Sequence, residues 1–158
     1  MLLPDLPTSA ADGEAIVPQS ERSRLRLVRC QIERRPAARS RVSVEFEGPW
    51  FTGPLVCEQE GTTCPGGDLR LAARATLDAL TTATQDALRF DLVGVKPSRA
   101  FDTNVMLVAV MVHCADESTR VLGVAVEEDN DVLATVRATL HAVNRFVSPI
   151  LGPLPTTE

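Results

Sequence analysis

The chain has 158 residues, of which 44% are hydrophobic, and a formal net charge of -5 at pH 7. This length suits one domain, or two small repeats that share one core. The negative charge argues against a protein that binds nucleic acid over its whole surface. The longest apolar run, residues 105–112, is far shorter than the about 20 residues that cross a membrane.

Both ends of the chain differ in composition from the middle. Residues 1–22 are rich in Pro, Ser, Asp and Ala without periodicity, which predicts a mobile N-terminal tail. They have neither the basic start nor the apolar stretch of a signal peptide, so we expect a cytoplasmic protein. Residues 152–158 are expected to form a second short tail, and residues 23–151 a single domain.

Residues 23–88 are expected to form three strands and then a helix. The strands are placed at residues 24–33, 41–47 and about 50–58. In the first strand the apolar alternation slips at Leu27-Val28, which predicts a β-bulge, whereas the second alternates cleanly. Asp68 is the expected N-cap of the helix. A stripe at helical spacing predicts its buried face: Leu69, Ala72, Ala73, Thr76, Leu77 and Leu80.

Residues 89–151 repeat this order of elements. The strands are placed at residues 89–95 (ended by Lys96-Pro97), 104–114 and 119–127. The strand at 104–114 is almost continuously apolar, so both its faces need cover, within the domain or from another subunit. The helix is expected to begin at Asn130 or Asp129 and to stop at Pro149. Its predicted buried stripe is Val132, Val136, Thr139, Leu140, Val143 and Val147.

The two expected helices share a sequence. Residues 74–80 read RATLDAL and residues 137–143 read RATLHAV, so that five of seven positions are identical. Residues 51–53 are matched in the same way with residues 121–123 before the second helix. We therefore predict an α+β fold of two consecutive βββα units, residues 23–88 and 89–151. They would pack about a pseudo-twofold axis as a two-layer α/β sandwich with antiparallel sheet.

The second unit also resembles a known family. Gly123-Val124-Ala125, the polar turn at residues 128–130 and the helix motif at residues 137–145 are similar to the C-terminal regulatory domain of 2-isopropylmalate synthase. The resemblance covers about residues 24–151, and its recognisable motif lies in the last 28 or so of them. In that family these backbone positions lie near an amino-acid effector, at the interface of paired domains.

The resemblance implies a homodimer that binds a small-molecule effector. It places the ligand near Gly123, Ala125, Asp129 and Asn130. The family's catalytic barrel of about 250 residues has no room in this chain, so we do not expect its condensation reaction. The expected function is a non-enzymatic dimerisation and small-molecule-sensing module.

An arginine-rich segment offers an alternative function. Residues 22–41 hold eight of the sixteen basic residues. They form either a solvated strand face or a patch that docks an acidic protein or nucleic acid. The candidate contacts for such a partner are Arg24, Arg26, Arg29, Arg34 and Arg35.

Catalytic and metal-binding patterns are not recognised in the sequence. His113 and Cys114 are neighbours on a predicted strand, so their side chains point to opposite faces and cannot form a nucleophile–base pair. The acidic turn at residues 127–131 lacks the spacing of a calcium loop and is explained by helix capping. The four cysteines show no zinc-site spacing. We expect no catalytic residue, metal or cofactor.

Overall fold

The computed structural model describes residues 25–49 and 51–151 of the chain. The two predicted tails, at residues 1–22 and 152–158, lie outside this part. The first half runs β1 (Arg26–Arg35), β2 (Arg39–Glu47), β3 (Leu55–Thr62) and α2 (Gly67–Ala83). The second half runs β4 (Leu88–Ala100), β5 (Thr103–Cys114), β6 (Glu117–Val126) and α3 (Asp131–Leu151). Neither helix is long and apolar enough to span a membrane.

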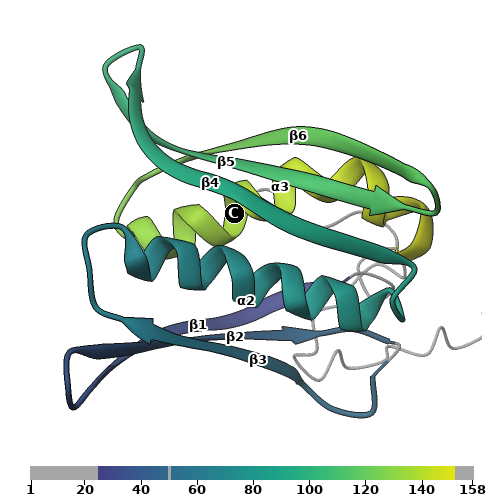
Figure 1. Cartoon of the computed structure of the whole chain (residues 1–158), viewed down its shortest axis with the longest axis horizontal. Helices are drawn as coiled ribbons and strands as arrows, with labels where there is room; N and C mark the ends of the chain where they lie inside the picture. Colours follow the sequence, from purple (N-terminus) through teal and green to yellow (C-terminus); the bar gives the residue numbers. More distant parts are fainter. Residues whose placement is uncertain (1–24, 50, 152–158) are drawn as a thin grey trace, which may run out of the picture.

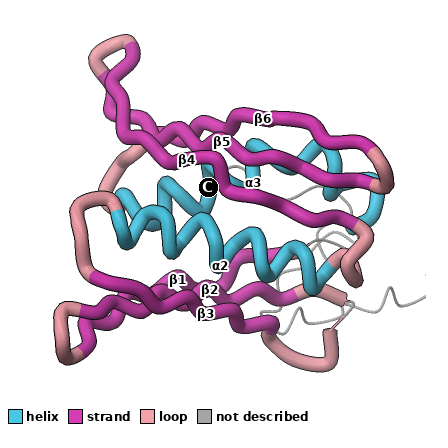
Figure 2. The backbone as a smooth tube through the Cα atoms, in the orientation of Figure 1, coloured by secondary structure: helices cyan, strands magenta, loops and turns pink. Residues whose placement is uncertain are grey.

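The strands form two antiparallel three-stranded sheets, which confirms the prediction of two βββα units in an α+β fold. The first sheet has the order β1-β2-β3 and the second the order β4-β5-β6. Both helices lie between the two sheets (Figures 1 and 2). Each unit is a two-layer sandwich of a sheet and a helix, but the whole domain has three layers where the sequence predicted two, because the two sheets lie on opposite sides of the helices. The face of each sheet toward the helices is called its inner face here, and the opposite face its outer face.

The hydrophobic core fills the space between each inner face and the helix layer. In the first sheet, Val42, Val44 and Phe46 of β2 are fully buried, as their clean alternation predicts. In the second sheet, the inner face of β5 contributes the buried side chains of Met106, Val108, Val110 and Val112. The predicted β-bulge is also present, because the β1–β2 register shifts between Leu27 and Arg29.

Both predicted helix stripes are buried, but α2 is buried more widely than its stripe. Leu71, Ala75 and Ala79 lie outside the predicted stripe and are buried as well. The reason is that α2 contacts β2 and β3 of the first sheet, β4 of the second, and α3. A helix inside a three-layer domain has several covered sides, and here alanines form much of the extra buried surface.

The shared helix sequence occupies equivalent positions in the two units. Thr76 and Thr139 are both fully buried, and each Oγ1 donates a hydrogen bond of 2.8 Å to the carbonyl four residues earlier. These local bonds satisfy hydroxyls that would otherwise be costly to bury. The matching of residues 51–53 with residues 121–123 is wrong. Residues 51–53 lie in the loop before β3, whereas residues 121–123 lie inside β6.

Two predicted element ends are wrong because of contacts elsewhere in the fold. Asp68 is not the N-cap of α2, since the cap is Gly66, at a φ of 73°. The Asp68 carboxylate instead forms an ion pair of 2.8 Å with Arg34. β3 lies at Leu55–Thr62 rather than at residues 50–58, because it pairs with β2 only from Leu55 onward.

Two prolines do not end their elements as predicted. Pro97 lies within β4 and pairs with Met106. β4 is an edge strand of its sheet, and an edge strand tolerates a residue without an N–H group. Pro149 lies in the last turn of α3, which ends at Leu151. Few helical hydrogen bonds remain to be lost at that point.

Gly123 is the point of closest approach between α3 and the second sheet. A Cβ atom built there would lie 2.6 Å from the Ala142 nitrogen and closer still to the Ala138 carbonyl oxygen. The backbone of β6 and the backbone of α3 therefore meet with no side chain between them. The requirement for glycine at this position is explained by packing.

Replacing Gly123 with alanine is expected to force α3 away from β6. We predict a loss of about 1–3 kcal/mol in the free energy of unfolding, as for other overpacked cores. Urea denaturation followed by circular dichroism measures it. The control is Gly53→Ala, because a Cβ at Gly53 meets nothing within 4 Å. An equal effect of the two substitutions would contradict the packing role of Gly123.

Candidate functional site

The four residues predicted to bind a ligand lie in different environments. Gly123 is buried against α3, and Ala125 is half-buried on the inner face of β6, paired with Met106. Asp129 is exposed. Asn130 caps α3, because its Oδ1 accepts hydrogen bonds from the N–H groups of Val132 (2.9 Å) and Leu133 (3.1 Å). Gly123 and Ala125 thus serve the core, while Asn130 lies at a groove.

This groove separates β1 from the first two turns of α3 and has a volume of about 410 Å3. Its lining is Arg26, Leu27, Val28, Arg29, Cys30, Asn130, Leu133 and Arg137. The β-bulge between Leu27 and Arg29 is part of this wall. Asn130 from the predicted ligand site therefore lines the same groove as Arg26 and Arg29 from the predicted partner site, although the guanidinium groups of these two arginines pair with Glu47 and Glu45. Arg137 of the repeated helix sequence lines the same groove.

The three arginines of the groove differ in their ion pairs. Arg26 pairs with Glu47 at 2.9 Å, and Arg29 lies 3.9 Å from Glu45. Arg137 forms no ion pair with any carboxylate in the described part of the chain. The N-terminal end of α3, which carries a partial positive charge, also lies here, although Asp131 in the first turn offsets part of it. Arg137 is the cation best placed to receive an external anion.

The apolar part of the groove includes a cysteine that stays protonated. Burial raises the pKa of the Cys30 thiol to about 11. At neutral pH Cys30 therefore presents a neutral, weakly polar surface beside Leu27 and Leu133. The groove combines a basic side with an apolar side, which suits an anion that carries a short apolar group.

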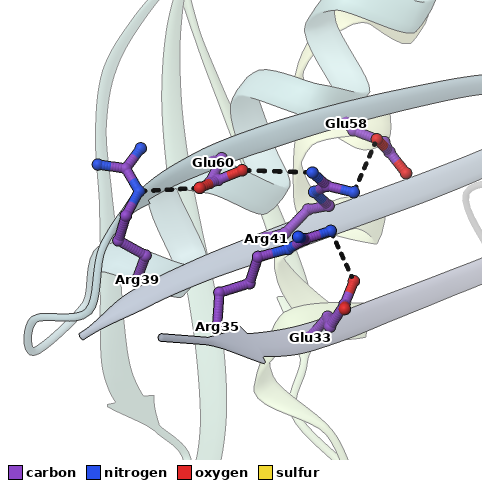
Figure 3. A network of polar contacts seen from close by, with 6 residues as sticks. All are labelled: Glu33, Arg35, Arg39, Arg41, Glu58 and Glu60. Carbon is purple, nitrogen blue, oxygen red and sulfur yellow. Dashed lines mark hydrogen bonds and ion pairs between the residues drawn. The ribbon is translucent and has the colours of Figure 1, made fainter. Parts of the chain in front are cut away.

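Most of the arginine-rich segment is paired with glutamates across the first sheet. On the outer face, five arginines meet five glutamates: Arg26, Arg29, Arg35, Arg39 and Arg41 with Glu33, Glu45, Glu47, Glu58 and Glu60. Figure 3 shows how Arg41 lies between Glu58 and Glu60. Arg34 pairs with Asp68, and Arg24 lies outside the described residues. These formal charges cancel on the outer face, so the segment is not a cationic patch.

Sequence reasoning missed a three-residue contact on the outer face of the second sheet. His113 of β5 contacts Asp91 of β4 through Nε2 and Ser118 of β6 through Nδ1, each at 2.7 Å. The order of carboxylate, imidazole and hydroxyl is that of a hydrolase triad. The Asp91 side chain is 78% exposed, however, and Ser118 is exposed. Water competes with each of these hydrogen bonds. We therefore assign the contact to cross-strand pairing.

The strand pairing explains why this contact was not predicted. The three residues lie on three different strands. Only the registers of both strand pairs, β4 with β5 and β5 with β6, bring them together. Both ring nitrogens of His113 are engaged in this contact, with Ser118 and Asp91. All four cysteines are free thiols.

Comparison with known proteins adds no assignment. No family model matches the chain, and no curated protein matches its sequence. The resemblance to the synthase regulatory domain stays a prediction that rests on its motif residues.

The raised pKa of Cys30 predicts slow alkylation. At pH 8 its thiolate fraction is about 100-fold lower than that of a thiol with the ordinary pKa of 9.0. Iodoacetamide should therefore modify the exposed Cys64 and Cys114 much faster than Cys30, as measured by peptide mass spectrometry. In denaturant the rates should converge. Equal rates in the folded protein would contradict the burial of Cys30.

The ion pairs of Glu60 predict a pH-dependent contribution to stability. Hydrogen bonds from Arg39, and then from Arg41, lower the pKa of Glu60 below its usual 4.5. A lowered folded-state pKa stabilises the fold above the unfolded pKa, and this stabilisation is lost as the pH falls through the folded value. The destabilisation by Glu60→Gln should therefore shrink between pH 5 and pH 3 in urea titrations. Glu128→Gln, at an exposed residue outside these pairs, is the control. A pH-independent effect of Glu60→Gln would be evidence against the pairing.

Proposed function

We propose that the chain is a non-enzymatic module that binds a small carboxylate or phosphate in the groove between β1 and α3. The observation that carries the proposal is Arg137, which lines the groove beside an apolar wall and forms no ion pair with a described carboxylate, whereas Arg26 and Arg29 are paired with Glu47 and Glu45. Binding of a small-molecule effector is also the function that the synthase resemblance implies. The proposal moves the site from the Gly123 region to the Asn130 end of α3.

The chemistry of the groove limits the ligand. Guanidinium groups bind carboxylates and phosphates through two parallel hydrogen bonds, and this geometry favours arginine over lysine. The volume of about 410 Å3 lies toward the small end of small-molecule sites, which span roughly 300–1,000 Å3. Leu27, Leu133 and the neutral Cys30 thiol favour an apolar group on the ligand. A short organic acid fits these features better than a polyanion.

The alternative of an acidic protein or nucleic-acid partner gains no support from the arginine-rich segment. Its described arginines on the outer face of the first sheet already contact glutamates. A polyanion would have to displace these carboxylates before it could bind. A single small anion at Arg137 has no such competitor among the described residues.

Thermal unfolding with a panel of organic acids, amino acids and phosphates tests the proposal. A ligand at 100 times its Kd stabilises the folded state by about 2.7 kcal/mol, which raises the Tm by several degrees. We expect such a rise for the wild type and its loss in Arg137→Gln. The matched control is Arg74→Gln, at the equivalent position of the repeated sequence in α2. The proposal fails if no anion raises the Tm, or if Arg137→Gln keeps the full rise.

A further inference from the structure

β1 is the strand that the helices cover least. α2 packs on β2, β3 and β4, and α3 packs on β5 and β6, so that neither helix covers β1 to a similar extent. Apolar side chains on its inner face are therefore left partly exposed, and Ile32, which pairs with the buried Val42, is 39% exposed. Leu27 and Cys30 continue this apolar strip into the groove. We propose that the groove binds the C-terminal end of an extended peptide, an inference that rests on the proposed binding of a carboxylate there.

The groove runs along the free edge of β1. β1 is an edge strand of the first sheet, and no other described strand pairs with its second side. Five consecutive residues of the strand, 26–30, line the groove. Because successive side chains of a strand point to opposite faces, such a run shows that the backbone edge itself faces the groove. Along an edge, alternate residues direct their N–H and C=O groups outward, where the backbone of an extended peptide can pair with them.

The length of the groove limits the peptide to its last few residues. Five residues of a strand span about 13 Å, at about 3.3 Å per residue. The β-bulge between Leu27 and Arg29 also interrupts the ladder on this wall, so that a long added strand could not stay in register. A chain that ends in the groove needs no such register. Roughly three or four residues therefore fit along the edge, and the last of them carries a free carboxylate.

Arg137 is placed to receive that carboxylate. It is half-buried on α3 and forms no ion pair with a carboxylate in the described part of the chain. The first N–H groups of α3 are already occupied, because Asn130 accepts those of Val132 and Leu133. A guanidinium group binds a carboxylate through two parallel hydrogen bonds. The peptide carboxylate is therefore assigned to Arg137 rather than to the end of the helix.

The groove also has a place for an aliphatic side chain. Leu133 lines it from α3, and Leu27 and the protonated Cys30 line it from β1. If the side chain of the last peptide residue points toward the inner face of the sheet, it meets these three residues. Burial of apolar surface then favours valine or another aliphatic residue at the peptide C-terminus over a charged one.

The equivalent groove of the other unit lacks this setting. It lies between α2 and the edge strand β4, and its volume is about 250 Å3. Arg74 of the repeated sequence lines it, but so do Asp78 and Asp91. Two carboxylates beside one arginine disfavour the entry of a third. The chain thus contains its own matched comparison, an equivalent arginine in a groove that does not suit a peptide C-terminus.

Fluorescence polarisation with the full chain tests the proposal. The probe is a six-residue peptide of serine, threonine and alanine that ends in valine and carries fluorescein on its N-terminus. The free acid should bind, and the same peptide with a C-terminal amide should bind about tenfold more weakly or worse, because the charge-assisted hydrogen bonds are lost. Arg137→Gln should cause a similar loss for the free acid. The matched control, Arg74→Gln, should bind like the wild type.

Two further measurements test the pairing with β1. Because alternate amides pair with a strand edge, methylation of either the last or the preceding backbone nitrogen of the peptide should weaken binding, and methylation of the other should not. In proton–nitrogen correlation spectra of the wild type, the free acid should shift the amide signals of residues 26–30 and leave those of β4 in place.

The outcomes separate the peptide from other ligands of the groove. Equal binding of the acid and the amide overturns the inference, and so do amide shifts in β4 instead of β1. If short organic acids raise the Tm of the wild type but the peptide does not bind, the groove takes free acids, and the peptide proposal fails alone. If neither binds, both proposals fail.

Discussion

The two sheets of this domain share one layer of helices. How closely the sheets and helices approach one another determines which residues the helices and the facing strands can carry. A helix that touches two sheets and another helix needs small apolar residues on several sides. Alanine supplies them in both helices, at Ala75 and Ala79 in α2 and at Ala138 and Ala142 in α3. Where even alanine is too large, at the crossing of α3 over β6, the strand carries Gly123. The buried threonines fit the same layer because their hydroxyls bond within their own helix.

The internal repeat is preserved on the inside of the domain and lost on the outside. Both inner faces meet similar helices, so similar side chains serve both units. The outer faces have no common neighbour, and they differ: ion pairs cover the first, whereas the second carries exposed aliphatic side chains such as Leu122 beside the polar contact of His113 with Asp91 and Ser118. The two units thus share one scaffold and differ in the side chains that they present to solvent.

The fold was predictable from the sequence to the extent that its signals are local. The helix stripes, the alternation in β2 and the bulge at Leu27 all arise within a few neighbouring residues, and each was predicted. The errors concern residues whose role depends on a distant partner. Asp68 caps no helix because Arg34 lies across from it, and Pro97 continues its strand because β4 is at an edge. The groove could not be predicted for the same reason, since Arg26 and Arg137 belong to opposite ends of the chain.

One hydrogen bond on the rim of the second sheet limits the pairing of further strands with that edge. β6 is an edge strand, and its Val124 N–H donates to Nδ1 of His141, 3.0 Å away on α3. At this position the edge donor is already occupied, so another strand cannot pair with it there. This hydrogen bond hinders the addition of further strands at the β6 edge, although the outer face of the sheet exposes aliphatic side chains. A domain with exposed aliphatic side chains such as Leu122 gains from such a block, because β6 becomes a poorer template for aggregation.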